Sequence, residues 1–345
     1  MLAIDGAYGE GGGQILRTAS ALSALMKESI EINNIRANRP SPGIRPQHYT
    51  AISCIKAICK GVAEGLSVGS SRLRFIPGKI QPGEYNFNVG TAGSIILIFQ
   101  TCILASLKTP EPITIKIIGG TDVKWAPTWD YFTNVFLPMI GKMGVKTESE
   151  LINRGYYPKG GGEAKIKIFP VRKLSNLRLE EGYFGKIEGI VHISNLPDHV
   201  GRRMKHAAMK IAIKNNVRSY IQVENANSLS PGTGITLWCK SDKTILGATM
   251  LGEKGVSAER IGEKAAHQIL REIKMKATLD SNTFDQILPY MVLAENKSTC
   301  IVRELTMHAQ TNMWLVNQFF KDKNIFQIEE KQDVKLIKVN GVGFI

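Results

Sequence analysis

Features that this chain lacks narrow its class before any motif is considered. Its five cysteines include no CxxC pair, which argues against a zinc site and favours buried thiols in a reducing compartment. The first residues show no basic segment followed by an apolar run, so no secretory signal peptide is expected. The longest apolar stretch, 95–107, contains Gln100 and Thr101 and is shorter than the roughly 20 residues that span a bilayer. We therefore expect a cytoplasmic protein with no membrane partner.

Aromatic residues are also scarce, at 7%, so a broad base-stacking surface is not evident. Negative charge is in deficit, because 44 Lys+Arg against 30 Asp+Glu give a formal net charge of +14. Such a surplus favours a polyanionic partner such as nucleic acid or a nucleotide, and a basic surface that serves solubility alone is the open alternative.

Strand and helix patterns alternate along the chain and then restart. Residues 1–80 and 85–170 each contain a Gly-rich turn that leads into an apolar helical pattern, together with short alternating strands. A shorter third copy is expected at 280–345. Between the copies, 181–277 has its own strand–helix–strand pattern and is predicted to be an inserted domain. The predicted fold class is therefore α+β, with a main domain of 1–180 and 278–345 and an inserted domain of 181–277.

The segment Gly9-Glu10-Gly11-Gly12-Gly13-Gln14 precedes one of the predicted helices. Glycines let backbone N–H groups approach an anion, and a helix N-terminus favours negative charge. The segment matches neither GxGxxG nor the phosphate-loop pattern, so a plain tight turn is the alternative. Glu10 would repel a phosphate unless a cation lay between them. It is therefore a candidate ligand for Mg²⁺ or Mn²⁺ that bridges to a nucleotide.

A cluster of hydrogen-bond donors follows between residues 36 and 48. Arg36, Arg39 and Arg45 lie around a Pro-rich turn, with Gln47 and His48 directly after it. Because guanidinium groups bind phosphate oxygens bidentately, the cluster favours a phosphate terminus as its ligand. A solvated basic loop is the alternative.

Two further segments carry little information when taken singly. The Gly-rich run 154–162 predicts a turn. His308 is one of six histidines and stands where an alternating strand gives way to a helix, a position more typical of a structural histidine than of a nucleophile.

Taken together, these segments resemble the RNA 3′-terminal phosphate cyclase family. The matches occur in family order along nearly the whole chain, and their combination is specific although each piece alone is weak. The matching runs are Asp5-Gly6, GEGGGQILR (9–17), IRANRPSPGIRPQH (35–48), GTAGS (90–94), GGTD (119–122), RGYYPKGGG (154–162), GEKGVSAE (252–259), Asp285-Gln286 and HxxTN (308–312).

The resemblance implies three repeats similar to the C-terminal domain of bacterial translation initiation factor three, plus an inserted smaller α/β domain. It also implies an ATP-dependent ligase that converts an RNA 3′-terminal phosphate into a 2′,3′-cyclic phosphate. His308 would first take AMP from ATP and release pyrophosphate, AMP would then pass to the 3′-phosphate, and the neighbouring 2′-OH would finally expel it. A neutral imidazole suits the first step, and the last step is intramolecular.

Site residues follow from the same resemblance, motif by motif. His308 matches the adenylated histidine, and Glu10 also matches the residue near the divalent metal, Mg²⁺ or Mn²⁺. Residues that match the ATP site are Glu10, Gln100, Pro127, Asn282, Thr283, Phe284, Asp285 and Gln286. Residues that match the site for the RNA 3′-phosphate end are Arg17, Arg36, Arg39, Gln47 and His48. Relatives often carry a histidine or an aromatic residue where this chain has Asn282, which leaves the adenine contacts around 282–284 open.

Three other functions compete with the cyclase interpretation. A non-catalytic, cyclase-like ribosome-biogenesis factor shares the fold but lacks the adenylated histidine, and the run His308–Asn312 argues against it. An enolpyruvyl transferase has similar repeats, but its small acidic substrates would not explain the charge of +14. A plain RNA-binding module would release no pyrophosphate.

Overall fold

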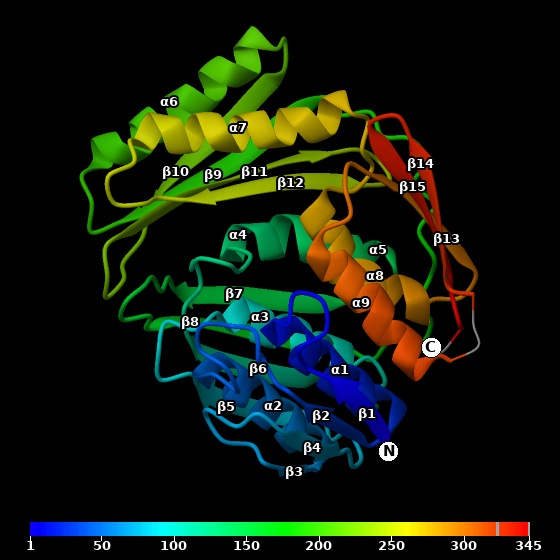
Figure 1. Cartoon of the computed structure of the whole chain (residues 1–345). Helices are drawn as coiled ribbons and strands as arrows, with labels where there is room; N and C mark the ends of the chain where they lie inside the picture. The colour runs from blue at the N-terminus through cyan, green and yellow to red at the C-terminus, as the bar shows by residue number, and fades with distance from the viewer. Residues whose placement is uncertain (322–323, 344–345) are drawn as a thin grey trace.

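The computed structural model describes residues 1–321 and 324–343 of the 345-residue chain. Within these residues it contains three four-stranded sheets and one three-stranded sheet, with helices packed between and against them (Figure 1). The structure confirms in outline the mixture of helices and sheets that the sequence predicts. No helix of the described ranges is long and apolar enough to cross a membrane.

The first two units have the same topology. In each, the first two strands are parallel and the remaining pairs are antiparallel, and the strand order is first, second, fourth, third. The first unit consists of β1 (Leu2–Asp5), α1 (Gly13–Met26), β2 (Ile30–Asn33), α2 (Pro46–Cys59), β3 (Val62–Glu64) and β4 (Leu73–Ile76). The second consists of β5 (Gly83–Asn88), α3 (Ile95–Ala105), β6 (Ile113–Gly119), α4 (Trp129–Tyr131), the π-helical turn η1 (Phe132–Phe136), α5 (Leu137–Lys142), β7 (Thr147–Asn153) and β8 (Gly162–Ile168).

A third, smaller unit lies near the C-terminus. Its antiparallel sheet has the order β13-β15-β14. The sequence places this copy at 280–345, but the structure adds a short segment from before residue 180. Arg178 forms a parallel bridge with Thr299 of β13, at the edge where the other units have their first strand. The elements of this unit are α8 (Ser281–Leu293), β13 (Lys297–Val302), α9 (Met307–Phe319), β14 (Phe326–Lys331) and β15 (Val334–Asn340).

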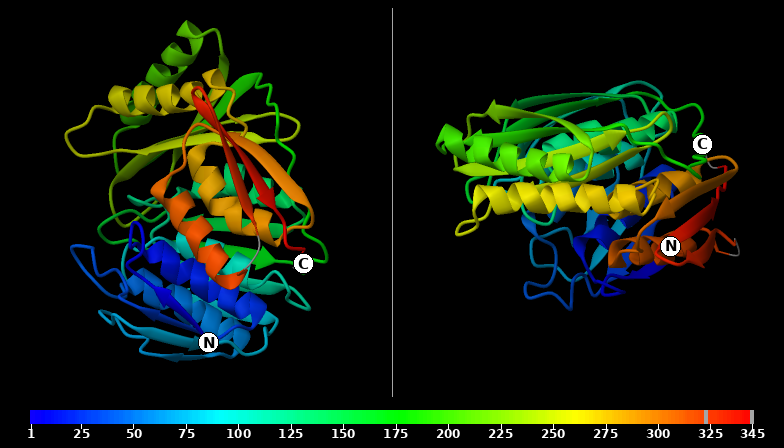
Figure 2. Two further views of the ribbon diagram at one scale, coloured as in Figure 1. Left: turned by 45° about the vertical axis from the view of Figure 1, so that its right-hand side comes forward. Right: turned by 90° about the horizontal axis from the view of Figure 1, so that it is seen from above.

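The chain between the bridge segment and α8 forms a separate sheet with its own apolar core. The strand order is β10-β9-β11-β12, and helices α6 and α7 lie side by side on the outer face (Figures 1 and 2). Helix α4 contacts β11 and β12 and lies below the sheet in Figure 1. The elements are β9 (Lys186–Ser194), α6 (Asp198–Lys214), β10 (Arg218–Asn225), β11 (Gly232–Lys240), β12 (Ile245–Leu251) and α7 (Ala258–Lys274).

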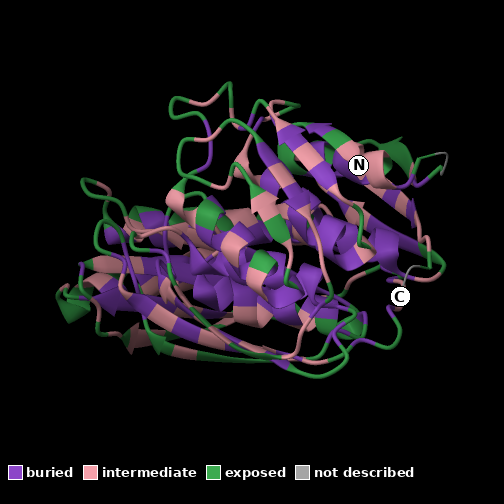
Figure 3. Ribbon diagram, turned by 90° about the horizontal axis from the view of Figure 1, so that it is seen from below, coloured by how far each residue is buried: buried purple, intermediate pink, exposed green. Residues whose placement is uncertain are grey.

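The core of the first two units centres on α3. Its sequence, IILIFQTCILA, is apolar almost all round because the helix packs against both α1 and α2. Figure 3 shows the resulting concentration of buried residues in the helices between the sheets. All five cysteines are free and buried, as the sequence predicts. The two polar residues of this helix, Gln100 and Thr101, line a cleft that the units share.

Candidate active site

A cleft of about 920 Å³ lies between the N-terminal ends of α1 and α2 and helices α3, α8 and α9. Twelve of the fourteen residues that the sequence assigns to the site line it, although they come from distant parts of the chain. These are Glu10, Arg17, Arg36, Arg39, Gln47, His48, Gln100, Pro127, Asn282, Asp285, Gln286 and His308. Thr283 and Phe284 do not line it, because their side chains are fully buried in the protein interior.

His308 is the second residue of α9, where the Thr306 side chain caps the helix by accepting a hydrogen bond from Ala309 N. Its Nδ1 lies 2.7 Å from an oxygen of Glu10, and 47% of its side chain is exposed. With the Nδ1 proton donated to Glu10, the lone pair of Nε2 is left free. His308 therefore combines an oriented imidazole with access to a ligand.

The protonation state of His308 follows from its neighbours. Burial lowers the pKa of the imidazole below its usual 6.5, the Glu10 carboxylate raises it, and Arg17 and Arg39 lower it again. The balance is a lowered pKa, so the ring is mainly neutral at neutral pH. A neutral ring is the nucleophilic form.

The loop that carries Glu10 depends on its glycines. Gly9 and Gly11 adopt φ values of +57° and +56°, which favour glycine. A Cβ on Gly13 would lie 2.0 Å from Nε2 of His48, so a side chain there would displace the imidazole. Just before the loop, Tyr8 stacks on Trp314 of α9 with ring centroids 3.9 Å apart. This stack joins the glycine-rich loop to the helix that bears His308.

The entrance to α1 and α2 concentrates positive charge. Burial, together with Arg36, lowers the pKa of Arg17 to about 10. Glu10 forms an ion pair with Arg39. Arginines gathered around one carboxylate are arranged for a further anion.

Gln47 and His48 have structural contacts in addition to their places in the cleft. The Gln47 side-chain oxygen accepts a hydrogen bond from Ser94 N at 3.0 Å, which joins the first unit to the second. His48 Nδ1 accepts one from Arg45 N and so caps α2. Burial and the adjacent arginines hold the pKa of His48 well below its usual value, so this ring is neutral.

The deeper part of the cleft is less charged. Gln100 Nε2 donates to the side-chain oxygen of Gln286 at 2.6 Å, and apolar groups such as Leu97 and Leu104 line the wall beside them. Burial raises the pKa of Asp285 well above its usual value despite a hydrogen bond from Thr306. A protonated Asp285 can donate a hydrogen bond, and the paired amides offer both donors and acceptors. Such a wall suits a nucleobase.

Oxygen donors near Glu10 fit a hard divalent cation. The side-chain oxygens of Gln14 and Asn312 line the same cleft, are buried and have no hydrogen-bond partner. Mg²⁺ and Mn²⁺ prefer oxygen ligands, and Mg²⁺ typically uses one or two carboxylates together with water and substrate phosphates. The residues present therefore agree with the metal expectation for Glu10.

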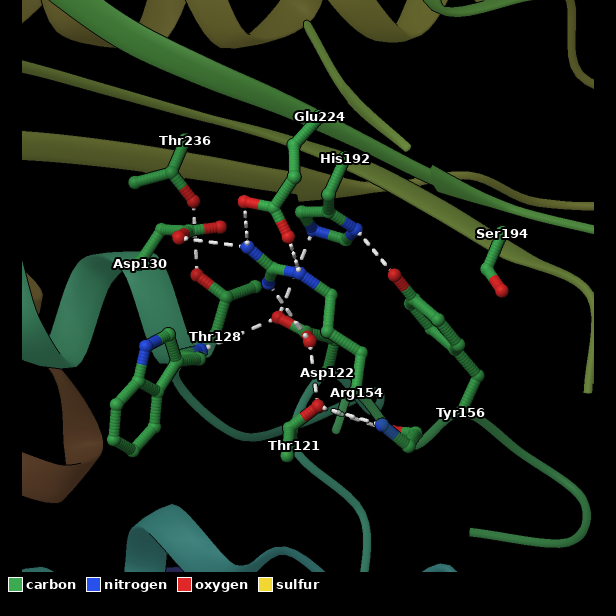
Figure 4. A network of polar contacts seen from close by, with 12 residues as sticks. Thr121, Asp122, Thr128, Asp130, Arg154, Tyr156, His192, Ser194, Glu224 and Thr236 are labelled. Atoms are coloured by element: carbon green, nitrogen blue, oxygen red, sulfur yellow. Dashed lines mark hydrogen bonds and ion pairs between the residues drawn. The ribbon is translucent and has the colours of Figure 1, made fainter. Parts of the chain in front are cut away.

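A second charged cluster lies where the loops at the ends of β6 and β8 meet the β9–β12 sheet (Figure 4). Arg154 donates to Asp122 at 3.2 Å, to Asp130 at 2.9 Å and to both oxygens of Glu224 at 2.9 and 3.0 Å. The ligand atoms of Asp122, Asp130 and His192 lie within 4.8 Å of one another. Because the guanidinium already bonds both aspartates, we interpret the cluster as a structural ion network.

Sequence reasoning missed this network and several residues that line the cleft, Trp125 among them. The run 154–162 predicts only a turn, and nothing local indicates that Arg154 reaches Glu224, 70 positions away. Trp125 also lines the cleft and is 96% exposed. An aromatic residue inside a Gly/Pro-bounded loop was the available signal for it.

Comparisons with known proteins point to one family. A family model described as RNA 3′-terminal phosphate cyclase matches residues 8–325. An RNA 3′-terminal phosphate cyclase of Pyrococcus furiosus is 42% identical over 98% of this chain and 99% of the relative. Those of Pyrobaculum aerophilum and Methanosarcina mazei are 43% and 41% identical and cover 99% and 98% of this chain, and 98% and 100% of their own lengths.

Proposed function

The chain belongs to the RNA 3′-terminal phosphate cyclase family, and we propose that it converts RNA 3′-terminal phosphates into 2′,3′-cyclic phosphates at the expense of ATP. The observation that carries the proposal is the contact of His308 with Glu10 inside a cleft that also gathers Arg17, Arg36 and Arg39. One nucleophile, one orienting carboxylate and several phosphate-binding cations suit the transfer of a nucleotidyl group.

In the first step, Nε2 of His308 attacks the α-phosphorus of ATP. A phosphorus–nitrogen bond forms, the bond to pyrophosphate breaks, and Glu10 can take up the Nδ1 proton that the ring no longer holds. A divalent cation bound at Glu10 would offset the negative charge of the triphosphate. The wall that contains Gln100, Gln286 and Asp285 would hold the adenine.

In the second step, an oxygen of the RNA 3′-phosphate attacks the AMP phosphorus and the imidazole leaves, regaining its proton. Arg36 and Arg39 would bind the phosphate by charge-assisted hydrogen bonds, with Arg17 behind them. In the third step, the 2′-OH attacks the 3′-phosphorus and AMP departs. Because the 2′-OH is already adjacent, proximity removes most of the entropic barrier.

We further propose that the three units are the family's repeats and that 181–277 is the inserted domain. The shared strand order of the first two units and the separate apolar core of the β9–β12 sheet support this division. The parallel bridge of Arg178 with Thr299 supports a third unit that is interrupted after its first strand.

The decisive experiment is to incubate the protein with α-labelled ATP and to look for label that stays on the chain and is released by acid. Wild type should be labelled by α-labelled but not by γ-labelled ATP, because AMP and not phosphate is transferred. His308→Ala and His308→Asn should lose all labelling and cyclisation while keeping the fold, as judged by circular dichroism. His199→Ala, which removes an exposed histidine of α6, should behave as wild type. Labelling of folded His308→Ala would refute the assignment.

A further inference from the structure

Trp125 combines two unfavourable features at the rim of the cleft. Its side chain is 96% exposed, more than any other large apolar side chain in the described part of the chain. Its φ angle is +63°, in the left-handed region that bulky residues rarely adopt. Burying an indole is among the largest apolar gains available to a protein. Exposure and strain together at a ligand-binding cleft indicate a functional role.

The loop that carries Trp125 is held by hydrogen bonds at both ends. Asp122 accepts a hydrogen bond from Trp129 N at 3.2 Å and is itself held by Arg154. At the other end, the Thr128 hydroxyl lies 2.9 Å from that of Thr236 in β11. Such a loop presents its apex to solvent without needing to be ordered by a ligand.

A neighbouring loop also carries an exposed aromatic side chain. Thr121 N donates to Gly155 O at 2.9 Å, so the loop before β8 lies beside the one after β6. That second loop carries Tyr157, 78% exposed, and the exposed Lys159. Aromatic side chains interspersed with cations are typical of surfaces that bind single-stranded nucleic acid.

We propose that Trp125 stacks on the base of the 3′-terminal nucleotide of the RNA, an inference that rests on the proposed cyclase activity. The choice of RNA over ATP follows from position. AMP is small enough for the deeper cleft, where Leu97, Leu104 and Tyr290 form an enclosing wall. The RNA chain has to leave through the open mouth, and Trp125 stands at that mouth.

Stacking has a recognisable consequence for specificity. It tolerates every base because each has a π-face, and it favours the larger purine face. The protein should therefore act on all 3′ ends but prefer a terminal purine. Trp125→Ala should remove most of that preference, which a purely structural defect would not do.

The test uses the protein without ATP, so that bound RNA is not converted, and short oligoribonucleotides that end in a 3′-phosphate on A or on U. Trp125→Ala should bind both RNAs roughly 5- to 150-fold more weakly, with the larger loss for terminal A. Trp125→Phe should retain most of the affinity because it keeps a ring. Tyr183→Ala, which removes an exposed aromatic residue outside the cleft, should match wild type.

Two further measurements make the outcome unambiguous. RNA should quench part of the intrinsic tryptophan fluorescence of wild type, and the quenched component should be missing in Trp125→Phe. Labelling by ATP should proceed at the wild-type rate and with the wild-type KM in Trp125→Ala. A raised KM for ATP with unchanged RNA affinity would overturn the proposal and assign the indole to adenine.

Equal losses for terminal A and terminal U, or a Trp125→Phe variant as weak as Trp125→Ala, would likewise overturn stacking. Failure of the proposed cyclase function has a different signature, namely wild type that is neither labelled by ATP nor able to cyclise RNA. The quenching and binding measurements need no catalysis, so the two failures can be told apart.

Discussion

The cleft and the junction with the β9–β12 sheet contain the same kinds of charged side chain, but these are partly exposed in the cleft and mostly buried at the junction. Each has an arginine and a histidine in contact with at least one carboxylate. In the cleft, the side chains of Glu10, Arg39 and His308 are 30%, 32% and 47% exposed. At the junction, Arg154 is 1% exposed and His192 is fully buried. Burial, rather than residue type, separates the two.

The two arginines also differ in how many hydrogen bonds they make within the protein. Arg154 makes four hydrogen bonds to three carboxylates, so its donors are largely satisfied within the protein. Arg39 donates to a single carboxylate in the described part of the chain, that of Glu10, and its side chain lines the cleft. A saturated cluster stabilises the fold, whereas an unsaturated one retains capacity for a ligand. The comparison therefore predicts which substitutions cost stability and which cost activity.

The largest effect is expected at the junction. Arg154→Ala would leave Asp122 and Asp130 buried without their cation, which should lower the free energy of unfolding by about 3–5 kcal/mol. Urea denaturation measures this. The control is Arg203→Ala, which breaks an exposed pair with Glu259 and should cost at most about 1 kcal/mol. If both variants lower the free energy of unfolding by the same small amount, the buried cluster does not stabilise the fold more than an exposed ion pair.

Glu10→Gln should show the reverse pattern. It removes a positioned charge beside His308, so adenylation should slow by about 10²–10³-fold while the free energy of unfolding changes little. Single-turnover labelling with ATP measures the rate, and Glu64→Gln, at an exposed pair with Arg74, serves as the control. If the adenylation rate is unchanged, the glycine-rich loop is a structural turn with no role in adenylation.

The pH dependence of adenylation by Glu10→Gln distinguishes two roles of Glu10, namely orienting His308 and binding the metal. The neutral imidazole is the nucleophile, so the adenylation rate falls as the pH drops through the pKa of His308. Glu10 raises that pKa, and its removal should therefore move the acid limb of the profile to lower pH. An unchanged acid limb would mean that Glu10 does not affect the pKa of His308.

A smaller effect is expected for Arg39→Ala. If Arg39 holds the RNA phosphate, the variant should still accept AMP from ATP but transfer it about 10- to 150-fold more slowly, since a charge-assisted hydrogen bond contributes about 1.5–3 kcal/mol. The log–log salt slope of RNA binding should also become shallower by about 0.7. Arg72→Ala, at an exposed pair with Glu31, is the control. Equal slowing of adenylation would place Arg39 at the ATP triphosphate.

Local patterns predicted the helices that shape the cleft. Helix α1 follows the glycine-rich loop, as the sequence predicts. Helical periodicity also explains the two expected residues that miss the cleft. Asn282, Asp285 and Gln286 share one face of α8 at i, i+3 and i+4, whereas 283 and 284 fall on other faces. Applying the helical period to the predicted ATP-site residues would have excluded 283 and 284.

Contacts between distant segments were beyond the reach of the sequence. The hydrogen bond from Ser94 N to Gln47, the stack of Tyr8 on Trp314 and the four bonds of Arg154 join different units of the fold. No local spacing encodes them, because they depend on how the units pack. The resemblance to the cyclases gave twelve residues that line the cleft but not the partners that orient them.

The entry to and exit from the β9–β12 region lie side by side, which has a consequence for how such a chain could arise. The Thr278 hydroxyl donates to Leu179 O at 2.9 Å, and both residues bond to β13, at Ile301 and Thr299. To the rest of the molecule, the chain between Leu179 and Thr278 is therefore equivalent to a tight turn. Its gain or loss in ancestry would reroute none of the flanking backbone. On the proposed division of the chain, the cleft and the β9–β12 sheet therefore had separate histories, and the Arg154 network joins them.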